Sequence, residues 1–255
     1  MDCLSNRSQP GNAVADSATQ KPIEPADDRR PATGPVAAGI PLKWCTIIPG
    51  RPPDGLGLFL PSDPDAVLMD TDEDEFFAND ERMPYFTALW ESAEALVHHI
   101  MDGPKLTDLR VLDLGCGAGA VGLAAARRNA RVSFFDWEPR AMEMVALSAR
   151  AQGLTIEDRI AADWREPPPL EPFDLILAAD VLYEPRNIDA VCQFVRDHLK
   201  PGGQARIADP GRPNAEPFPE RARALGLAMD GPEPLCVIHG PVIQLWTVTV
   251  PSASH

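Results

Sequence analysis

Short apolar runs of strand length alternate with segments of helical periodicity through most of the chain after residue 110. The strand-like runs cover residues 110–114, 131–136, 155–161, 173–178 and 204–208, and the helix-like segments cover residues 118–129, 140–152, 187–199 and 217–225. Neighbouring parallel strands need a crossover connection, which is usually a helix. The alternation therefore predicts an α/β fold in which helices cover both faces of a parallel sheet.

The end of the chain departs from this alternation. Two further strand-like runs, 235–239 and 242–250, are separated only by Gly240 and Pro241. Such a short connection permits only antiparallel neighbours. We therefore expect a Rossmann-like, seven-stranded, mostly parallel sheet that closes with a C-terminal antiparallel hairpin. A dinucleotide-binding domain would instead add a sixth parallel strand through a helix.

The chain before the sheet divides by composition. Residues 1–43 contain no aromatic residue and are rich in Pro, Ala, Ser, Asp and Gly, so we expect a disordered N-terminal tail. Residues 44–83 predict a pair of strands around a Pro/Gly turn, followed by the acidic segment 63–81, which has no basic residue. That segment is interpreted either as a solvated loop or as an acidic rim that attracts a basic substrate. Residues 84–255 form the main domain.

Charge and cysteine usage narrow the classes of function. The formal net charge of −15 argues against a protein that tracks a nucleic-acid backbone, which needs a basic surface. Five cysteines are scattered without a CxxC pair, and the histidines lack ligand spacing, so we expect neither a metal site nor a disulfide framework. No apolar run is long enough to cross a membrane, and no secretory signal is present, so we expect a cytoplasmic protein.

The stretch VLDLGCGAGAVG, from Val111 to Gly122, can be read in two ways. It contains G-x-G-x-x-G, which holds dinucleotides, and also D-x-G-x-G-x-G, which holds S-adenosylmethionine (SAM). Glycines after a buried strand let backbone N–H groups approach either ligand. Asp113 separates the two, because a carboxylate repels a pyrophosphate but attracts the ammonium and sulfonium of SAM. We therefore expect the loop to bind SAM, through the residues Asp113, Gly115, Gly117 and Gly119.

The ends of two further strands carry residues that could bind the nucleoside part of the cofactor. Asp136 follows the second strand, where an acidic residue hydrogen-bonds ribose hydroxyls, although it is also placed to cap the helix before Pro139. Asp163 and Trp164 follow the third strand, where a carboxylate would accept the adenine amino group and an indole would stack on the ring. The alternative for Trp164 is a core aromatic residue. The nucleoside roles fit the nearby glycine loop better.

The fourth strand ends in the sequence DVLYE, which contains Asp180 and Tyr183. By themselves these two residues would only cap the helix that follows. Beside the glycine loop, they lie where the methyl donor is expected, at the carboxyl end of a central strand. We therefore predict that both residues are catalytic and that Asp180 also contacts the cofactor.

The segments DLGCGAG, FFDWEP, ADW, DVLYE and LKPGG, in this order, resemble class I (seven-β-strand) SAM-dependent methyltransferases. The D-x-x-Y sequence from Asp180 to Tyr183 is similar to that of their protein-lysine methyltransferase group. This group also carries an aromatic-rich helix before the glycine loop. Here that helix is PYFTALWESAEAL, and the resemblance implies that Trp90 flanks the cofactor.

A narrower resemblance concerns ADPGRP, residues 208–213, after the fifth strand. It is similar to the D-P-G-R-P of the lysine methyltransferases that act on the β-subunit of electron-transfer flavoprotein, which implies a protein substrate. The sequences ALWES and REPPPLEP depart from that group near the substrate entrance. Two alternatives stay open. One is a small-molecule N- or O-methyltransferase on the same fold, and the other is an NAD(P)-dependent oxidoreductase.

In the first hypothesis, a neutral lysine amine displaces the methyl group of the sulfonium. Asp180 would orient the amine through a hydrogen bond. Tyr183 would narrow the channel around the alkyl chain and offer its hydroxyl as a second polar contact.

Overall fold

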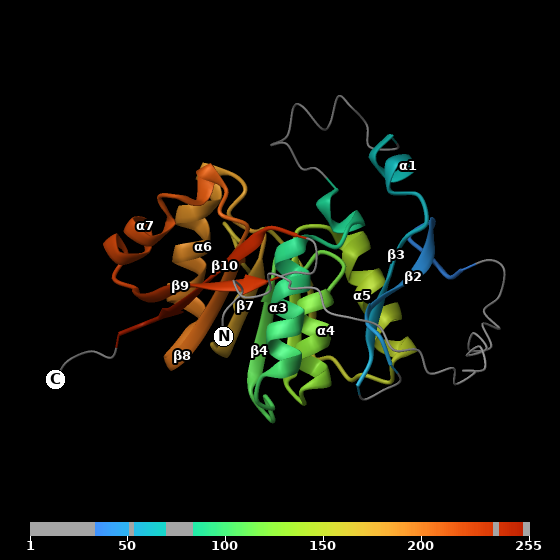
Figure 1. Ribbon diagram of the computed structural model, residues 1–255, viewed down its shortest axis with the longest axis horizontal. Helices are drawn as coiled ribbons and strands as arrows, with labels where there is room; N and C mark the ends of the chain where they lie inside the picture. Colours follow the sequence, from blue (N-terminus) through green and yellow to red (C-terminus); the bar gives the residue numbers. More distant parts are fainter. Residues whose placement is uncertain (1–33, 51–53, 70–83, 237–239, 252–255) are drawn as a thin grey trace, which may run out of the picture.

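A seven-stranded sheet forms the centre of the protein, in the strand order β6-β5-β4-β7-β8-β10-β9 (Figure 1). The computed structural model describes residues 34–50, 54–69, 84–236 and 240–251. The strands of the sheet are β4 Arg110–Leu114, β5 Arg131–Asp136, β6 Arg159–Ala161, β7 Phe173–Ala179, β8 Leu199–Asp209, β9 Ala228–Cys236 and β10 Val242–Thr249. Strands β4 to β8 pair in parallel, whereas β10 is antiparallel to both β8 and β9. The predicted fold class is confirmed.

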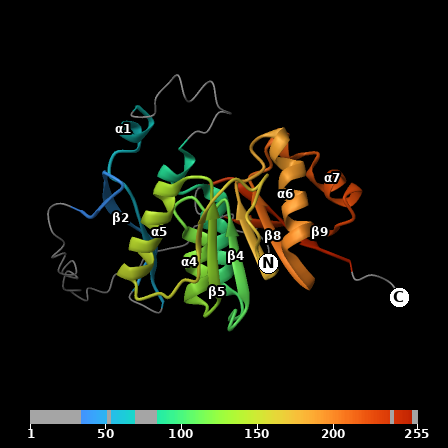
Figure 2. The same cartoon turned by 180° about the vertical axis from the view of Figure 1, so that it is seen from behind.

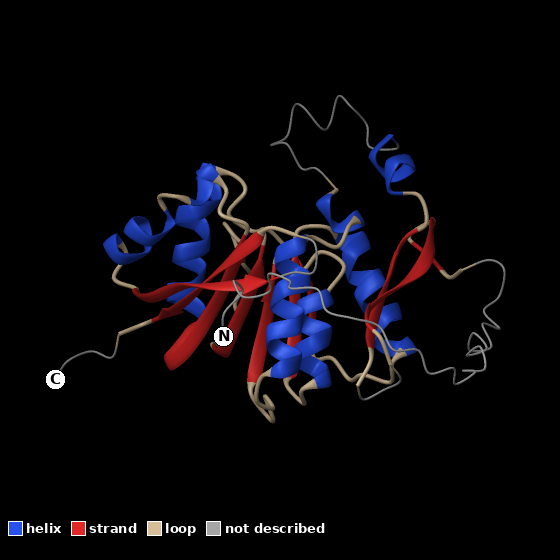
Figure 3. Ribbon diagram, in the orientation of Figure 1, coloured by secondary structure: helices blue, strands red, loops and turns tan. Residues whose placement is uncertain are grey.

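Helices cover both faces of this sheet, as expected (Figure 3). They are α3 Glu91–Asp102, α4 Ala120–Arg127, α5 Pro139–Ala151, α6 Pro185–His198 and α7 Phe218–Ala224, together with the 3-10 turns η1 Tyr85–Thr87 and η2 Pro213–Ala215. Among the described residues, no helix combines the length and the apolar character that a membrane span requires.

Alternate residues of the central strands point to opposite faces of the sheet and pack into two separate hydrophobic cores. Val111 of β4 packs with side chains of α3, α4 and α5, whereas its neighbour Leu112 packs with those of α6 and α7. Figure 2 shows α6 on the face opposite to α3. Because side chains alternate across a strand, both faces of β4 are buried and its apolar run is continuous.

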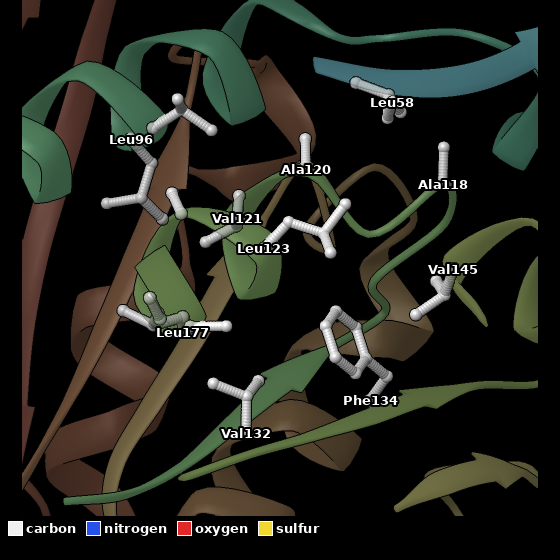
Figure 4. Close-up of a cluster of buried hydrophobic side chains, with 14 of the residues drawn as sticks. Leu58, Leu96, Ala118, Ala120, Val121, Leu123, Val132, Phe134, Val145 and Leu177 are labelled. Atoms are coloured by element: carbon white, nitrogen blue, oxygen red, sulfur yellow. The ribbon is translucent and has the colours of Figure 1, made fainter. Parts of the chain in front are cut away.

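A second, three-stranded antiparallel sheet precedes the main sheet in the chain. Its strands are β1 Val36–Ala37, β2 Ile40–Ile48 and β3 Leu56–Pro61, and a short helix, α1 Pro64–Met69, follows them. This sheet lies against α5 (Figure 1). The Phe59 N–H donates to the Ser148 hydroxyl over 2.9 Å, and the Gln152 amide donates to the Gly57 carbonyl over 2.7 Å. Leu58 is fully buried in the same cluster as Val145 (Figure 4).

The expected boundary of the N-terminal tail is therefore wrong within the described residues. Residues 34–43 belong to the predicted tail 1–43, yet they form β1 and the start of β2. Ile40 and Leu42 are buried because they alternate along β2 and face α5 and its neighbours. The rest of the tail lies outside the described residues, as do residues 70–83. The acidic segment 63–81 begins with α1 where a loop was expected.

Several element boundaries in the main domain also differ from prediction, among them that of β8, which begins at Leu199 and not at residue 204. The strand expected at 155–161 is only Arg159–Ala161, because the residues before it make isolated backbone bonds to β5. The helix expected from Phe86 begins at Glu91, since Trp90 is extended and serves as its N-cap. The hairpin is confirmed, but β9 begins at Ala228, and residues 237–239 of its predicted run lie outside the described part.

Replacement of Leu58 tests whether the N-terminal sheet folds as one unit with the main domain. Leu58→Ala should lower the free energy of unfolding by about 2 to 4 kcal/mol in a single cooperative transition, because it opens a cavity in the shared core. Val36→Ala is the control, since Val36 is 59% exposed and its loss should cost less than about 0.5 kcal/mol. Chemical denaturation of both variants measures the difference. An unchanged midpoint for Leu58→Ala would show that the two parts unfold independently.

Candidate active site

One pocket lies at the carboxyl ends of β4, β5 and β7 and encloses about 240 Å³. Most of the predicted site residues line it. They are Trp90, Asp113, Gly115, Gly117, Asp136, Trp164, Asp180 and Tyr183. Two predicted residues, Gly119 and Asp163, are not part of its wall.

The glycine loop connects β4 to α4 and forms the floor of the pocket. Gly115 has φ +66°, and a Cβ atom there would lie 2.9 Å from both the Trp164 ring and the Val181 side chain. The loop thus requires glycine both for its backbone conformation and for its close contact with the pocket wall. Gly119 instead packs against Val145, where a Cβ would lie at 2.6 Å. It is the N-cap of α4 and packs close to α5, and its contact with the cofactor remains a prediction.

Gly122, the last residue of the stretch with two readings, lies inside α4. A Cβ on Gly122 would overlap the Phe134 ring. It is therefore a close-packing residue between α4 and the sheet, as expected. The third glycine of a dinucleotide fingerprint has the same packing role. Gly122 thus does not separate the two readings, whereas the terminal antiparallel pair of strands favours SAM over a dinucleotide.

Two carboxyl groups are buried beside the loop. Asp113 is 2% exposed, and its Oδ2 accepts a hydrogen bond of 2.7 Å from the Gly122 N–H. Asp136 accepts hydrogen bonds from the Gly117 N–H over 2.8 Å and from the Glu138 N–H over 3.0 Å. Burial raises the pKa of Asp113 to about 7 and that of Asp136 to about 6. A bound cation would favour the ionised form of both groups.

The alternative role for Asp136, as the cap of the following helix, is wrong. Glu138 is the N-cap of α5, and its carboxylate accepts a hydrogen bond of 3.0 Å from the Arg140 N–H. Asp136 instead holds the glycine loop against the end of β5, because its Oδ2 accepts a hydrogen bond from the Gly117 N–H. Its carboxyl group lies in the pocket wall, where the ribose role places it.

Of the two neighbouring residues predicted to hold adenine, only Trp164 lines the pocket. The Trp164 indole lies in the pocket wall beside Gly115. The carboxylate of Asp163 makes a two-pronged ion pair with the Arg165 guanidinium, whose shortest contact is 2.6 Å. Contact between Asp163 and adenine remains a prediction, and the Arg165 side chain would need to share that carboxylate.

Asp180 has an unusual backbone conformation at the end of β7. Its φ is +60°, and its N–H donates to the carbonyl of Ala208 on β8 over 2.9 Å. The side chain is 9% exposed, and Oδ1 lies 2.5 Å from Nη1 of Arg212. Burial raises the pKa of Asp180, whereas Arg212 opposes that rise. The ion pair with Arg212 therefore favours the carboxylate form.

Tyr183 lies in an aromatic wall of the pocket. Its ring meets the Tyr85 ring edge-on at 5.2 Å, and Tyr85 meets Trp90 edge-on at 5.7 Å. The Trp90 indole N–H donates to the Tyr85 carbonyl over 3.0 Å. Burial raises the pKa of Tyr183 to about 12, and the Asn187 amide partly opposes this rise. The Tyr183 hydroxyl is therefore protonated at neutral pH.

Arg212 and Tyr85 are among the pocket residues to which the sequence assigned no role. Arg212 lies within the D-P-G-R-P segment, which indicated the substrate side but not one side chain. Tyr85 lies in the segment PYFTALWESAEAL, in which only Trp90 was given a role. The position of Arg212 three residues after Asp209, which ends a strand, was the available signal, but its contact with Asp180 depends on how two strand ends meet in space.

The strand order, the terminal antiparallel pair and the glycine loop between β4 and α4 together define the fold of class I SAM-dependent methyltransferases. Residues 111–203 also match the sequence profile of the family described as the methyltransferase domain. Residues 111–203 therefore match a methyltransferase domain, and the sheet around them has the class I fold. SAM is the cofactor that this family and fold imply, and the buried carboxyl groups beside the glycine loop fit its positive charges.

Individual relatives differ in the acceptor that they use. The chain is 33% identical over 134 residues to the electron transfer flavoprotein beta subunit lysine methyltransferase of Xenopus laevis, covering 51% of this chain and 53% of that protein. It is 33% identical over 125 residues to the ubiquinone biosynthesis O-methyltransferase of Chelativorans sp., covering 49% and 46%. The chain thus spans about half the length of the curated relatives it matches.

Among solved structures, the chain resembles a 16S rRNA methyltransferase of Thermus thermophilus in complex with AdoMet and guanosine. The TM-score is 0.55 at 16% identity, and the similarity covers 82% of this chain and 51% of that one. At this level of identity the likeness concerns the fold.

Asp113 gives the stability of the protein a defined pH dependence. Its folded-state pKa of about 7 lies above the usual 3.8, so the folded protein binds more protons between these values than the unfolded chain does. The stability that this group contributes is therefore lost as the pH rises from about 4 to about 7. Asp113→Asn should remove that loss, so the unfolding free energy of the variant relative to that of wild type should rise by about 3 kcal/mol across this range.

Denaturation of both proteins without cofactor at about pH 4.5 and pH 8 measures this change. Glu157→Gln is the control, because the Glu157 carboxylate pairs with Arg131 at the surface and is not part of the pocket. A constant difference between Asp113→Asn and wild type at the two pH values would contradict the assignment.

Proposed function

We propose that this protein transfers a methyl group from SAM to an amine, and that the amine belongs to a lysine side chain of a protein. The observation that carries the proposal is the position of the Asp180 carboxylate beside the aromatic wall of Tyr85, Trp90 and Tyr183. A lysine presents a flexible alkyl chain and a terminal nitrogen. An aromatic wall next to a carboxylate complements both parts.

The residues around the glycine loop would hold the cofactor. Asp136 would accept hydrogen bonds from the ribose hydroxyls, and Trp164 would stack on the adenine ring. The Asp113 carboxyl group lines the pocket beside the glycine loop and would favour the positive charges of the methionine part of SAM. When bound, SAM supplies a methyl group that its sulfonium has already activated for displacement.

On the acceptor side, this chain orients the nucleophile and excludes water. The carboxylate of Asp180 would accept a hydrogen bond from the amine N–H, which keeps the nitrogen lone pair directed along one axis. Tyr183 and Tyr85 would surround the alkyl chain, and Trp90 would close the pocket beside the cofactor. Tyr183 would contribute a hydroxyl that remains protonated, consistent with its raised pKa.

The curated relatives support two acceptor classes. The Xenopus laevis relative is named for a lysine of the electron transfer flavoprotein beta subunit, and a protein of that kind is the first partner that we propose. The Chelativorans relative is named as an O-methyltransferase of ubiquinone biosynthesis, so a small-molecule acceptor is the second candidate. The aromatic wall and Asp180 favour the lysine.

We also propose a cytoplasmic location, because the thiols of Cys45, Cys116 and Cys192 are free, as is usual in a reducing compartment.

A labelling experiment separates these acceptors. The pure protein and SAM with a labelled methyl group are added to a lysate of cells that lack this protein. Mass spectrometry then locates the label. Label on a lysine supports the proposal, label only in small solutes supports the second candidate, and label on another side chain contradicts the lysine assignment. Titration with S-adenosylhomocysteine and with NADH tests the cofactor separately, because tight binding of NADH alone would contradict methyl transfer.

Substitutions at the acceptor side should reduce turnover by a larger factor than they reduce the affinity for the cofactor, which Asp180 is also expected to contact. Asp180→Asn should lower kcat by about 100-fold, because it removes the group that orients the amine. Tyr183→Phe should lower kcat by about tenfold, the effect of one lost hydrogen bond. Turnover on the labelled acceptor and the affinity for S-adenosylhomocysteine measure the two effects.

Asp189→Asn serves as the matched control, because Asp189 is exposed on α6 and pairs with Arg221. It should retain wild-type turnover. Full activity of both Asp180→Asn and Tyr183→Phe would show that these residues do not act on the acceptor.

A further inference from the structure

The D-P-G-R-P segment folds around a buried carboxylate. Asp209 ends β8 with its side chain fully buried. One of its oxygens accepts hydrogen bonds of 2.8 Å from the N–H groups of both Gly211 and Arg212. Gly211 has φ +79°, which permits this tight turn. The turn sends the Arg212 side chain back toward the sheet.

The guanidinium of Arg212 joins the ends of two neighbouring strands. Its Nη1 lies 2.9 Å from Oδ2 of Asp209 and 2.5 Å from Oδ1 of Asp180. A backbone hydrogen bond of 2.9 Å from the Asp180 N–H to the Ala208 carbonyl holds the same two strand ends together. Asp180 is therefore fixed through both its backbone and its side chain, and D-x-x-Y and D-P-G-R-P form one structural unit.

Arg212 also supplies a positive charge to a pocket wall that otherwise carries carboxyl groups. The wall carries the carboxyl groups of Asp113, Asp136, Glu138 and Asp180, and Arg212 is the only lysine or arginine among the described residues that line it. Around Asp180, the charged neighbours are Arg212 and Asp209, and the hydroxyl of Ser92 faces it from α3. Without Arg212, Asp180 would be a buried carboxyl group beside a second buried carboxylate.

We propose that Arg212 is a positioning residue for methyl transfer, which holds Asp180 in its ionised form at the pocket wall and disfavours the protonated form of the acceptor amine. The inference rests on the proposed function. A protonated amine has no lone pair with which to attack the methyl group. A fixed positive charge near the entering nitrogen disfavours the ammonium form, while Asp180 still accepts a hydrogen bond from the neutral amine.

The first test needs no acceptor. Thermal unfolding of the full-length variants Arg212→Gln and Arg221→Gln is followed at about pH 6 and pH 8.5. Loss of Arg212 should raise the pKa of Asp180 further, so the midpoint of Arg212→Gln should fall more between these pH values than that of wild type. Arg221→Gln should follow wild type, because Arg221 pairs with the exposed Asp189 away from the pocket.

The double variant Arg212→Gln/Asp180→Asn identifies the group that titrates. It should lose the additional pH dependence if Asp180 is the carboxyl group that Arg212 controls. An additional pH dependence that persists would assign the effect to Asp209 and overturn the proposal. An Arg212→Gln profile identical to that of Arg221→Gln would also overturn it. Arg212→Lys keeps the positive charge and should stay close to wild type, which covers the case in which the glutamine variant folds poorly.

The second test uses the labelled acceptor and measures kcat/KM against pH. In Arg212→Gln the acidic limb of the profile should move to higher pH by about one unit, because both Asp180 and the amine then lose their protons less readily. Arg212→Lys should restore most of that shift, a result that a purely structural role of the guanidinium does not predict. An unmoved limb in Arg212→Gln would overturn the proposal. If wild type methylates no amine, the proposed function fails, and the unfolding measurements still decide how Arg212 acts on Asp180.

Discussion

The burial of several carboxyl groups around one pocket is the constraint on which the rest of the site depends. An ionised carboxyl group loses much of its hydration in such a position, so each one needs a compensating partner. Asp113 uses a backbone N–H of α4, and Asp136 uses a backbone N–H of the glycine loop. Asp180 uses the side chain of Arg212. The loop, the helix and the turn after β8 must therefore all be in place before the pocket can hold its charges.

These partners differ in what they leave for a ligand. Backbone N–H groups, one for Asp113 and two for Asp136, leave much of the cost of ionisation unmet, and the pKa values of these carboxyl groups remain raised to about 7 and about 6. A cationic cofactor would complete this compensation. Asp180 has the full positive charge of Arg212 beside it, which opposes the rise in pKa that burial causes. Under the proposed function, the cofactor side of the pocket would suit a positively charged molecule, and the acceptor side a neutral amine.

The sequence predicted the features that follow from local pattern. The alternation of strands and helices determined the sheet, and the glycine loop with Asp113 indicated its ligand. The pairing of Asp180 with Arg212 was not predictable in this way, because it depends on how two neighbouring strands end in space. Nor did composition show that Ile40 and Leu42 are buried, since the surface that covers them comes from distant helices. In both cases the deciding partner lies far away in the chain.

The backbone hydrogen bond from Asp180 to Ala208 bears on any redesign of the loops near Asp180. It couples the loop after β7 to the loop after β8, and Arg212 couples their side chains. If only one of these loops were transferred from a relative, either Asp180 or Arg212 would remain as a buried charge without its partner. The two loops are therefore best exchanged together, and under the proposed function such an exchange would alter the acceptor preference while leaving the glycine loop and its carboxyl groups intact.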